Sequence, residues 1–284
     1  MFYHLSNIYL FMKNILVPTD FSIASRNAAT YAVSLARSFG AKVTLINVVT
    51  PPIIVDDSIL ASVIVTQAEI LEANRKLMEQ EIEELSKNYP GINGFVEEGF
   101  TLDIIPKWVV EKQADLVVMG MKGKGKSSSV FGSTTTALIQ RCSFPIFVIP
   151  EMAIFNPIHS MTFASDFDST IESDRYASLL EISQKFNAMI NILHVQKKQS
   201  DLKSDEALGK MKTSLAFSKQ KHQFHTITEN KVEEGINKFI EQNHTDVLAM
   251  VAHKHSLFER MFGKVHTKAM SYQTEIPLLV LQSK

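Results

Sequence analysis

A glycine-rich segment, VVMGMKGKGKSSSVFGST at 117–134, carries the residue types best suited to binding an anion. Apolar residues lead directly into Gly120, Gly123 follows three positions later, and Gly132 and Ser133 begin nine positions after that. This order is typical of a buried strand, a glycine turn and the start of a helix. Backbone N–H groups at a helix start carry partial positive charge and bind phosphate. The spacing therefore indicates a phosphate site, and an ordinary Gly/Ser/Lys surface loop is the alternative.

Charged and hydroxyl side chains in the same segment also suit an anion. Lys122, Lys124 and Lys126 place positive charge after the expected strand, and hydroxyl groups follow at 127–129 and 133–136. Glycine adds a further property, because a residue without Cβ lets the backbone come close to a phosphate.

Asp20, in the sequence PTDFS, is a second candidate to line the same ligand site. It ends the first convincing apolar strand, and ligands of open parallel sheets bind outside the carboxyl ends of the strands. A carboxylate there can accept a hydrogen bond from a base amino group or a ribose hydroxyl. The alternative is that Asp20 caps the next helix, a common position for Asp.

Other reactive residue types form no convincing site. The serines of the first half have no nearby histidine, so no nucleophile–base pair is evident and Asp20 is the one candidate acid or base. No carboxylate or cysteine pattern completes a metal site around the later histidines. We therefore expect packing or solvated histidines at these positions, which are His222, His225, His253, His255 and His266.

Composition limits the class of protein. The 284 residues, 45% hydrophobic and 21% charged, suit about two globular domains. A net charge of -1 offers no basic field for a nucleic acid or an acidic membrane. No apolar run approaches the ~18–20 residues that span a bilayer. The single cysteine, Cys142, excludes an internal disulfide and indicates a cytoplasmic protein, with the thiol packed rather than redox-active.

The first eleven residues lack the features of a signal peptide. Met12 directly precedes the first convincing strand, so we expect translation to begin there and residues 1–11 to be an upstream extension. A genuine N-terminal arm starting at Met1 is the alternative.

The chain repeats one plan twice, with matching blocks in the same order, which indicates tandem duplication. Asp20 falls opposite Asp166. The matching blocks are 14–22 with 161–169, 31–49 with 176–195, 113–120 with 244–251, and 143–150 with 275–282.

Short apolar runs alternate with helical patterns in each copy. Continuous Val/Ile/Leu strands between helices predict a parallel sheet covered on both faces. The fold class is therefore α/β, with two doubly wound open parallel sheets in tandem. Asp103 is expected to cap a helix that has Pro106 in its first turn. Expected strands are 14–18, 43–49, 92–97, 115–119, 145–149 and 222–228, expected helices are 23–39, 66–88, 104–113, 132–141 and 204–220, and 197–203 is an expected loop.

This combination resembles the universal stress protein family, and in particular its tandem two-domain members. The resemblance covers most of residues 13–284 and is carried by ILVPTDFS, the block 31–49, VVMGMKGK, GST and PIFVIP. It implies a first domain at 12–150, a linker at 151–157 and a second domain at 158–284. In this family the last strands pair across a two-fold interface, so the two domains are expected to pack as a pseudo-dimer, and a homodimer of the whole chain stays open.

The family motif Gly-x2-Gly-x9-Gly-Ser/Thr cradles ATP in its ATP-binding members. This chain has eight residues between Gly123 and Gly132, one fewer, so AMP or another adenine nucleotide remains an alternative, with or without Mg²⁺. By resemblance, the adenosine part would contact Asp20 and either Val48 or Val49, next to Pro18 and Thr19. The ribose and phosphates would contact Met119, Gly120, Lys122, Gly123, Gly132, Ser133 and Thr134.

The second copy keeps Asp166 and Gly263 but has Val251, Lys254 and Lys264 where the first copy has Gly120, Gly123 and Ser133. We therefore expect no ATP there in the family's manner. The sequence favours a cytoplasmic stress-response regulator that binds a nucleotide in its first domain and acts on an unidentified protein partner. Slow ATP hydrolysis at the same site and a nucleotide-free interaction scaffold are the alternatives.

Overall fold

A ten-stranded sheet forms the centre of the part of the chain that the computed structural model describes, residues 12–51, 60–121, 133–196, 204–252 and 276–282. The first half contributes, in spatial order, β3 (Ile92–Glu98), β2 (Lys42–Val49), β1 (Asn14–Pro18), β4 (Leu116–Met121) and β5 (Ile146–Pro150). The second half continues with β10 (Leu278–Gln282), β9 (Val247–Ala252), β6 (Ser160–Ala164), β7 (Met189–Gln196) and β8 (His222–Thr228).

Neighbouring strands within each half are parallel, and the two halves join through one antiparallel pair, β5 with β10. Phe147 faces Leu279 at the middle of this junction. The α/β doubly wound fold is confirmed. The sheets of the two halves join into one continuous sheet through β5 and β10, the pairing of last strands that the family resemblance implies, because these apolar edge strands satisfy each other's backbone groups.

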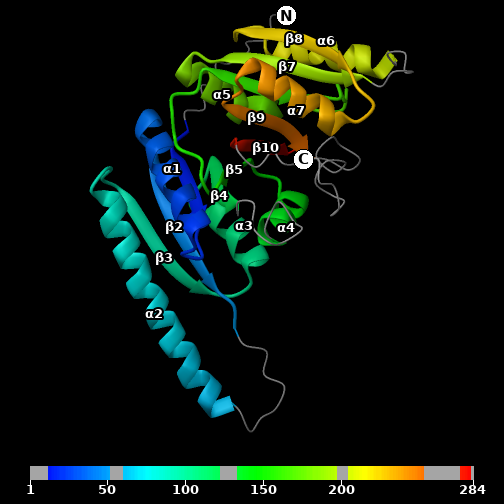
Figure 1. Ribbon diagram of the computed structural model, residues 1–284. Coiled ribbons are helices and arrows are strands. Elements are labelled where there is room, and N and C mark those ends of the chain that lie inside the picture. Colours follow the sequence, from blue (N-terminus) through cyan, green and yellow to red (C-terminus); the bar gives the residue numbers. More distant parts are fainter. Residues whose placement is uncertain (1–11, 52–59, 122–132, 197–203, 253–275, 283–284) are drawn as a thin grey trace, which may run out of the picture.

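Helices cover both faces of the sheet (Figure 1). One face packs against α1 (Ile23–Phe39), α2 (Leu60–Ser86) and α5 (Ala177–Phe186), and the segment that follows α6 (Ser204–Ala216) joins this core through Phe217. The other face packs against α3 (Thr101–Glu111), α4 (Ser133–Arg141) and α7 (Val232–Asn243). Within β1, Ile15 and Val17 enter the first core and Leu16 the second. Because both faces are covered, central strands such as β5 and β9 are buried and apolar along their whole length.

Local signals account for both ends of α1. Ser22 is the N-cap, and its hydroxyl accepts a hydrogen bond from the Ser25 amide at 3.3 Å. Gly40 ends the helix with φ 71, a left-handed conformation that glycine adopts without steric cost. The helix therefore occupies 23–39, as predicted from the sequence.

The predicted start of α3 was wrong. The helix begins at Thr101 after Phe100, with no side-chain cap, so Asp103 lies in the first turn and Pro106 lies inside the helix. Gly99, with φ 153, brings the chain directly from β3 into the helix, and the Phe100 carbonyl accepts from the amides of Asp103 and Ile104. The backbone turn after β3 therefore sets the helix start in place of the Asp103 side chain.

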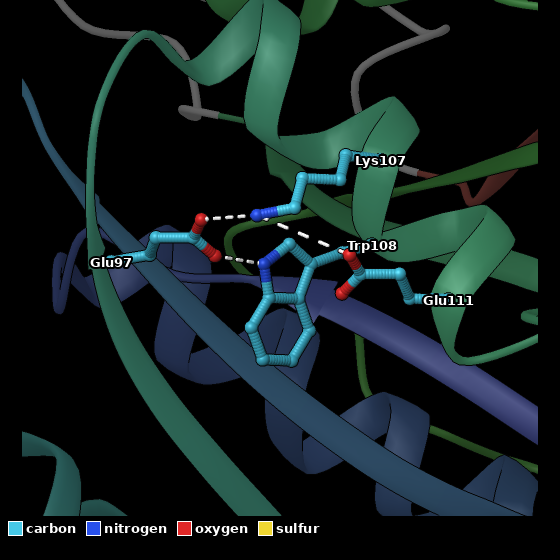
Figure 2. Close-up of polar contacts among 4 residues, drawn as sticks. All are labelled: Glu97, Lys107, Trp108 and Glu111. Carbon is cyan, nitrogen blue, oxygen red and sulfur yellow. Dashed lines mark hydrogen bonds and ion pairs between the residues drawn. The ribbon is translucent and has the colours of Figure 1, made fainter.

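Side chains fasten α3 to the edge strand β3 (Figure 2). Glu97 on β3 accepts from Lys107 Nζ at 2.8 Å and from the indole N–H of Trp108, and Lys107 also lies 4.0 Å from Glu111. The hydrogen bond from Lys107 lowers the pKa of Glu97, and so does the bond from Trp108, although burial opposes them. This attachment holds the first residue of α3, Thr101, beside the cavity described next.

Other boundaries moved by a few residues. The helix α2 starts at Leu60 rather than at residue 66. The helix α6 ends at Ala216 rather than at residue 220, because the chain leaves the helix in a turn in which the Gln220 amide donates to the Phe217 carbonyl. The expected loop at 197–203 lies outside the described residues.

Candidate functional site

A cavity of about 260 Å³ lies at the carboxyl edge of the first-half strands. It sits where β1 and β4 are neighbours and the chain order of the strands reverses, the place where doubly wound sheets bind ligands. Helix starts and strand ends together supply its walls. The lining residues are Pro18, Thr19, Asp20, Ser22, Ala24, Ser25, Ile46, Asn47, Val48, Thr101, Met119, Gly120, Thr134 and Thr135.

Seven of the predicted site residues lie in this set: Pro18, Thr19, Asp20, Val48, Met119, Gly120 and Thr134. Between the two valines, the structure places Val48 at the cavity, whereas Val49 is buried and points to the opposite face of β2. Ser133 is the first residue of α4. Lys122, Gly123 and Gly132 lie outside the described residues.

Asp20 is exposed at the mouth of the cavity and does not cap α1, since Ser22 does. Its Oδ1 accepts from the backbone amide of Ser22 at 3.1 Å, which folds the turn after β1 and leaves a carboxylate oxygen for a ligand. Partial burial raises the pKa of Asp20, but hydrogen bonds from Ser22 and Ser25 outweigh it and hold the pKa below its usual range. Asp20 is therefore an ionised hydrogen-bond acceptor at neutral pH.

Hydroxyl groups hold the turn beneath Asp20. Thr19 Oγ1 lies 3.1 Å from Ser25 Oγ and accepts from the amide of Phe21 at 3.1 Å. Phe21 has a φ of 60, a left-handed conformation that non-glycine residues seldom adopt. These bonds stabilise the turn that connects β1 to α1 and that presents Asp20.

Asn47 is a lining residue that sequence reasoning missed. It is buried in β2, and its amide donates to the Thr19 carbonyl at 2.8 Å, so it ties the end of β2 to the turn that carries Asp20. The signal was a polar residue inside the apolar run VTLINVV. In the second half, His194 makes the matching bond to the Ser165 carbonyl at 3.0 Å. Thr135, also missed, is buried in the first turn of α4.

Packing of the fold, as well as binding of a ligand, accounts for a glycine at position 120. A Cβ at this position would lie 2.4 Å from the Ala24 carbonyl oxygen and 2.8 Å from the Ser25 amide nitrogen. The presence of Val251 at the equivalent position of the repeat therefore does not mean that the first half can do without this glycine. The two halves differ here, because α1 starts five residues after the end of β1, whereas the 3-10 helix Ser173–Tyr176 and then α5 follow β6 after a longer connection.

The second half covers its equivalent surface with its own side chains. Ser165, His194 and Val251 are each less than 9% exposed, and the buried ring of Phe167 stacks on His194 at 5.0 Å. Gly209 of α6 packs so closely on Phe167 that a Cβ there would lie 1.7 Å from the Phe167 carbonyl oxygen. Lys254, Gly263, Lys264, His253, His255 and His266 lie outside the described residues.

Two further residues considered in the sequence analysis, Cys142 and His225, are packed against neighbouring groups. Burial raises the pKa of the Cys142 thiol to about 11, which makes it a poor nucleophile at neutral pH. His225 bonds Asn191 at 3.0 Å and packs on Phe239. In the described ranges, no three His, Cys, Asp or Glu side chains converge as metal ligands. Within the same ranges, no helix has the length and hydropathy needed to cross a bilayer.

The segment GMKGKGKS, Gly120–Ser127, also has the P-loop spacing Gly-x4-Gly-Lys-Ser. In a P-loop the first glycine follows the strand, and the Lys-Ser pair opens the helix. Here Gly120 is paired within β4 opposite Ile149, so the first glycine lies inside the strand. This position does not match a P-loop glycine, and Lys126 and Ser127 lie outside the described residues.

Replacement of Lys126 by alanine separates these two spacings. If the chain binds an adenine nucleotide without a P-loop, we expect at most about a fivefold loss of affinity, because one charge outside a P-loop contributes ~1 kcal/mol or less. Isothermal titration calorimetry measures it, with Lys87→Ala, an exposed residue just after α2, as control. A loss of affinity well beyond tenfold would instead identify Lys126 as a P-loop lysine.

Comparison with known proteins identifies relatives of this chain by sequence and by fold. The family model described as the universal stress protein family matches residues 12–150. A universal stress protein of Methanocaldococcus jannaschii is 30% identical over 148 residues, which are 51% of this chain and 84% of that protein. The crystal structure of a universal stress protein from Archaeoglobus fulgidus shares the fold, with a TM-score of 0.69 at 17% identity over 96% of this chain and 99% of that chain.

A putative universal stress protein from Pseudomonas aeruginosa has the same fold, with a TM-score of 0.55 at 13% identity over 95% of this chain and 93% of that chain. The sequence match in the first half and the fold match along the whole chain lead to one conclusion. The chain belongs to the universal stress protein family.

Proposed function

We propose that residues 12–150 form a domain that binds ATP or a related adenine nucleotide, and that this protein is a stress-response regulator rather than an enzyme of rapid turnover. Residues 158–284 would form a second domain without that site, joined by a linker at 151–157. The observation that carries the proposal is the meeting of Asp20, Gly120 and Thr134, from three separate segments, around one cavity.

Each wall of the cavity suits one part of a nucleotide. Ile46, Val48 and Met119 offer apolar surface to a base, and ionised Asp20 can accept from a ribose hydroxyl or a base amino group. Thr134 and Thr135 lie in the first turn of α4, where backbone amides and the helix dipole favour phosphate. Mg²⁺ bound with ATP would take mainly phosphate oxygens, and Asp20 is the carboxylate among the lining residues.

The state of Asp20 supports binding over catalysis. A general base is most effective when its pKa lies near the working pH, and the pKa of Asp20 is held below its usual range. No His, Glu or Lys is among the cavity-lining residues that the structure describes. We therefore expect the bound nucleotide to change the affinity for a protein partner, with little or no hydrolysis.

Calorimetry tests the proposal directly. We expect one ATP or AMP molecule to bind per chain. We also expect binding to change the fluorescence of Trp108, the one tryptophan of the sequence, which packs in the same core as Ile46 and Met119. Val48→Phe fills the cavity from β2 and should weaken binding by tenfold or more, while Val110→Phe, on the exposed side of α3, should not. If neither heat nor a thermal shift appears with any adenine nucleotide, the protein is a nucleotide-free scaffold.

A further inference from the structure

Helix α6 buries small residues and exposes large apolar ones. The face that packs on the second half carries Gly209 and Thr213, both buried. By contrast, Leu208, Met211 and Leu215 are 44%, 56% and 67% exposed. Their spacing of i, i+3 and i+7 places these three side chains in one line along the helix, which we call the α6 stripe. A surface helix usually has the reverse arrangement, with its apolar stripe toward the core.

Close backbone packing holds α6 in this orientation. A Cβ on Gly209 would lie 1.7 Å from the Phe167 carbonyl oxygen, so no larger residue of the helix can take that place. Lys212 Nζ donates to the Ser169 carbonyl at 2.7 Å and ties the same turn of the helix to the segment after β6. Rotation of α6 to bury Leu208 would break both contacts. The α6 stripe therefore faces away from the second half.

Positive charge accompanies the α6 stripe. From the start of α6 to the residue before β8, positions 204–221, the sequence has four lysines and two acidic residues, although the whole chain has a net charge of -1. Lys212 lies one helical turn from Leu208. Lys210 lies 5.3 Å from the Phe224 ring. Among the residues that the structure describes, neither lysine forms an ion pair with a carboxylate.

We propose that the α6 stripe docks an acidic amphipathic helix of a partner protein. Apolar side chains of that helix would cover Leu208, Met211 and Leu215, and its Asp or Glu residues would face Lys210 and Lys212. The helix α6 leads into β8, at the end of the sheet opposite to β3 (Figure 1). A partner on α6 therefore leaves the first-half cavity accessible to a nucleotide.

Two other occupants are less compatible with this surface. A second copy that placed α6 against α6 would bring the lysines of both chains together, and facing like charges oppose association. Membrane binding strengthens with the apolar area that enters the bilayer, and the α6 stripe offers three side chains and no aromatic ring. Charge and side-chain type therefore favour an acidic helix of another protein.

Fluorescence anisotropy with the full chain tests the proposal. The probe is a labelled peptide of Leu, Ala and Glu, with leucines at i, i+3 and i+7 and glutamates on both flanks. We expect it to bind, and the same peptide with Lys in place of Glu to bind several-fold more weakly. Met211→Glu should weaken binding of the Glu peptide roughly tenfold or more, because it places a carboxylate in the centre of the contact. Val110→Glu, on the exposed side of α3, is the matched control and should have no effect.

The opposite results are specific. No binding of the Glu peptide, or equal binding of the Glu and Lys peptides, would overturn the proposal. Met211 is exposed, so Met211→Glu should change the Tm by no more than about 2 °C. A larger fall would mean that the chain itself covers the α6 stripe, which would also refute docking of a partner.

Two further measurements separate the other occupants. Dimerisation of the wild type in analytical ultracentrifugation, absent in Met211→Glu, would assign the α6 stripe to a second copy and overturn the proposal. Binding to phosphatidylglycerol vesicles, lost in the same variant, would assign the stripe to a membrane and overturn it too. The inference supplies a surface for the protein partner named in the proposed function. None of its tests contains a nucleotide, so loss of peptide binding and loss of ATP binding are separate results.

Discussion

Replacement of Asp20 by asparagine is expected to weaken ATP or AMP binding roughly 10- to 100-fold. A hydrogen bond to a charged acceptor contributes about 1.5–3 kcal/mol, and each 1.4 kcal/mol is a factor of ten in affinity. Asp20 is exposed and its hydrogen bonds are local, from Ser22 and Ser25, so an asparagine oxygen can take over the bond from the Ser22 amide. The fold should therefore be intact while the ligand loses its one ionised acceptor. Calorimetry measures the affinity, and circular dichroism checks the fold.

The repeat supplies a matched control, because Asp166 occupies the same position after β6. Asp166→Asn makes the same chemical change on a surface where Phe167 and His194 already stack together. We expect no change in nucleotide affinity from it. If Asp166→Asn weakened binding as much as Asp20→Asn, the assignment of the site to the first half would be wrong.

Gly120→Val should destabilise the first half severely, by about 4 kcal/mol or more, since it forces side-chain atoms into backbone. The reason is the 2.4 Å approach that any Cβ at this position makes to the Ala24 carbonyl oxygen. The corresponding fall in Tm is roughly 8–16 °C. Thermal unfolding followed by circular dichroism measures it, and ATP binding should be lost along with the start of α1.

Val251→Ala is the control for the Gly120→Val substitution. It lies at the equivalent position of β9, where a side chain is accommodated, and removing two methyl groups should cost only about 1–3 kcal/mol. A Gly120→Val variant as stable as wild type would contradict the close packing of α1 on β4. For the same reason, loss of binding on substituting Gly120 would not by itself identify a ligand contact.

Sequence periodicity predicted the first half well. The bounds of β1 and α1 match the prediction, because a continuous apolar run and a Ser cap with a terminal glycine are local signals. Asp20 and Gly120 could be assigned to one edge of the sheet from the alternation of strands and helices, because the carboxyl ends of parallel strands share an edge. Met119 and Thr134 were expected there from the family resemblance, and the structure places all four at the cavity.

The differences from the prediction have two causes, a local backbone turn and contacts between segments distant in the chain. Asp103 looked like a cap, but the turn at Gly99, four residues earlier, set the start of α3. Asn47 looked like a stray polar residue, but its partner is the carbonyl of Thr19 on the adjacent strand. The repeat has Val251 at the position of Gly120, but a comparison of residue types cannot show that a Cβ at position 120 would lie 2.4 Å from the Ala24 carbonyl oxygen. Asn47 and Gly120 therefore depend on residues of other segments, whereas the start of α3 depends on the turn just before it.

The sequence by itself determined the α/β class, the two-fold repetition and the place of Asp20 and Gly120 at strand ends, because periodicity and turn residues act locally. Tertiary structure decided the register in which β5 and β10 join the two halves, with Phe147 opposite Leu279. It also decided that the buried ring of Phe167 stacks on His194 in the second half. Such contacts depend on which surfaces pack together, and packing joins residues that no local pattern relates.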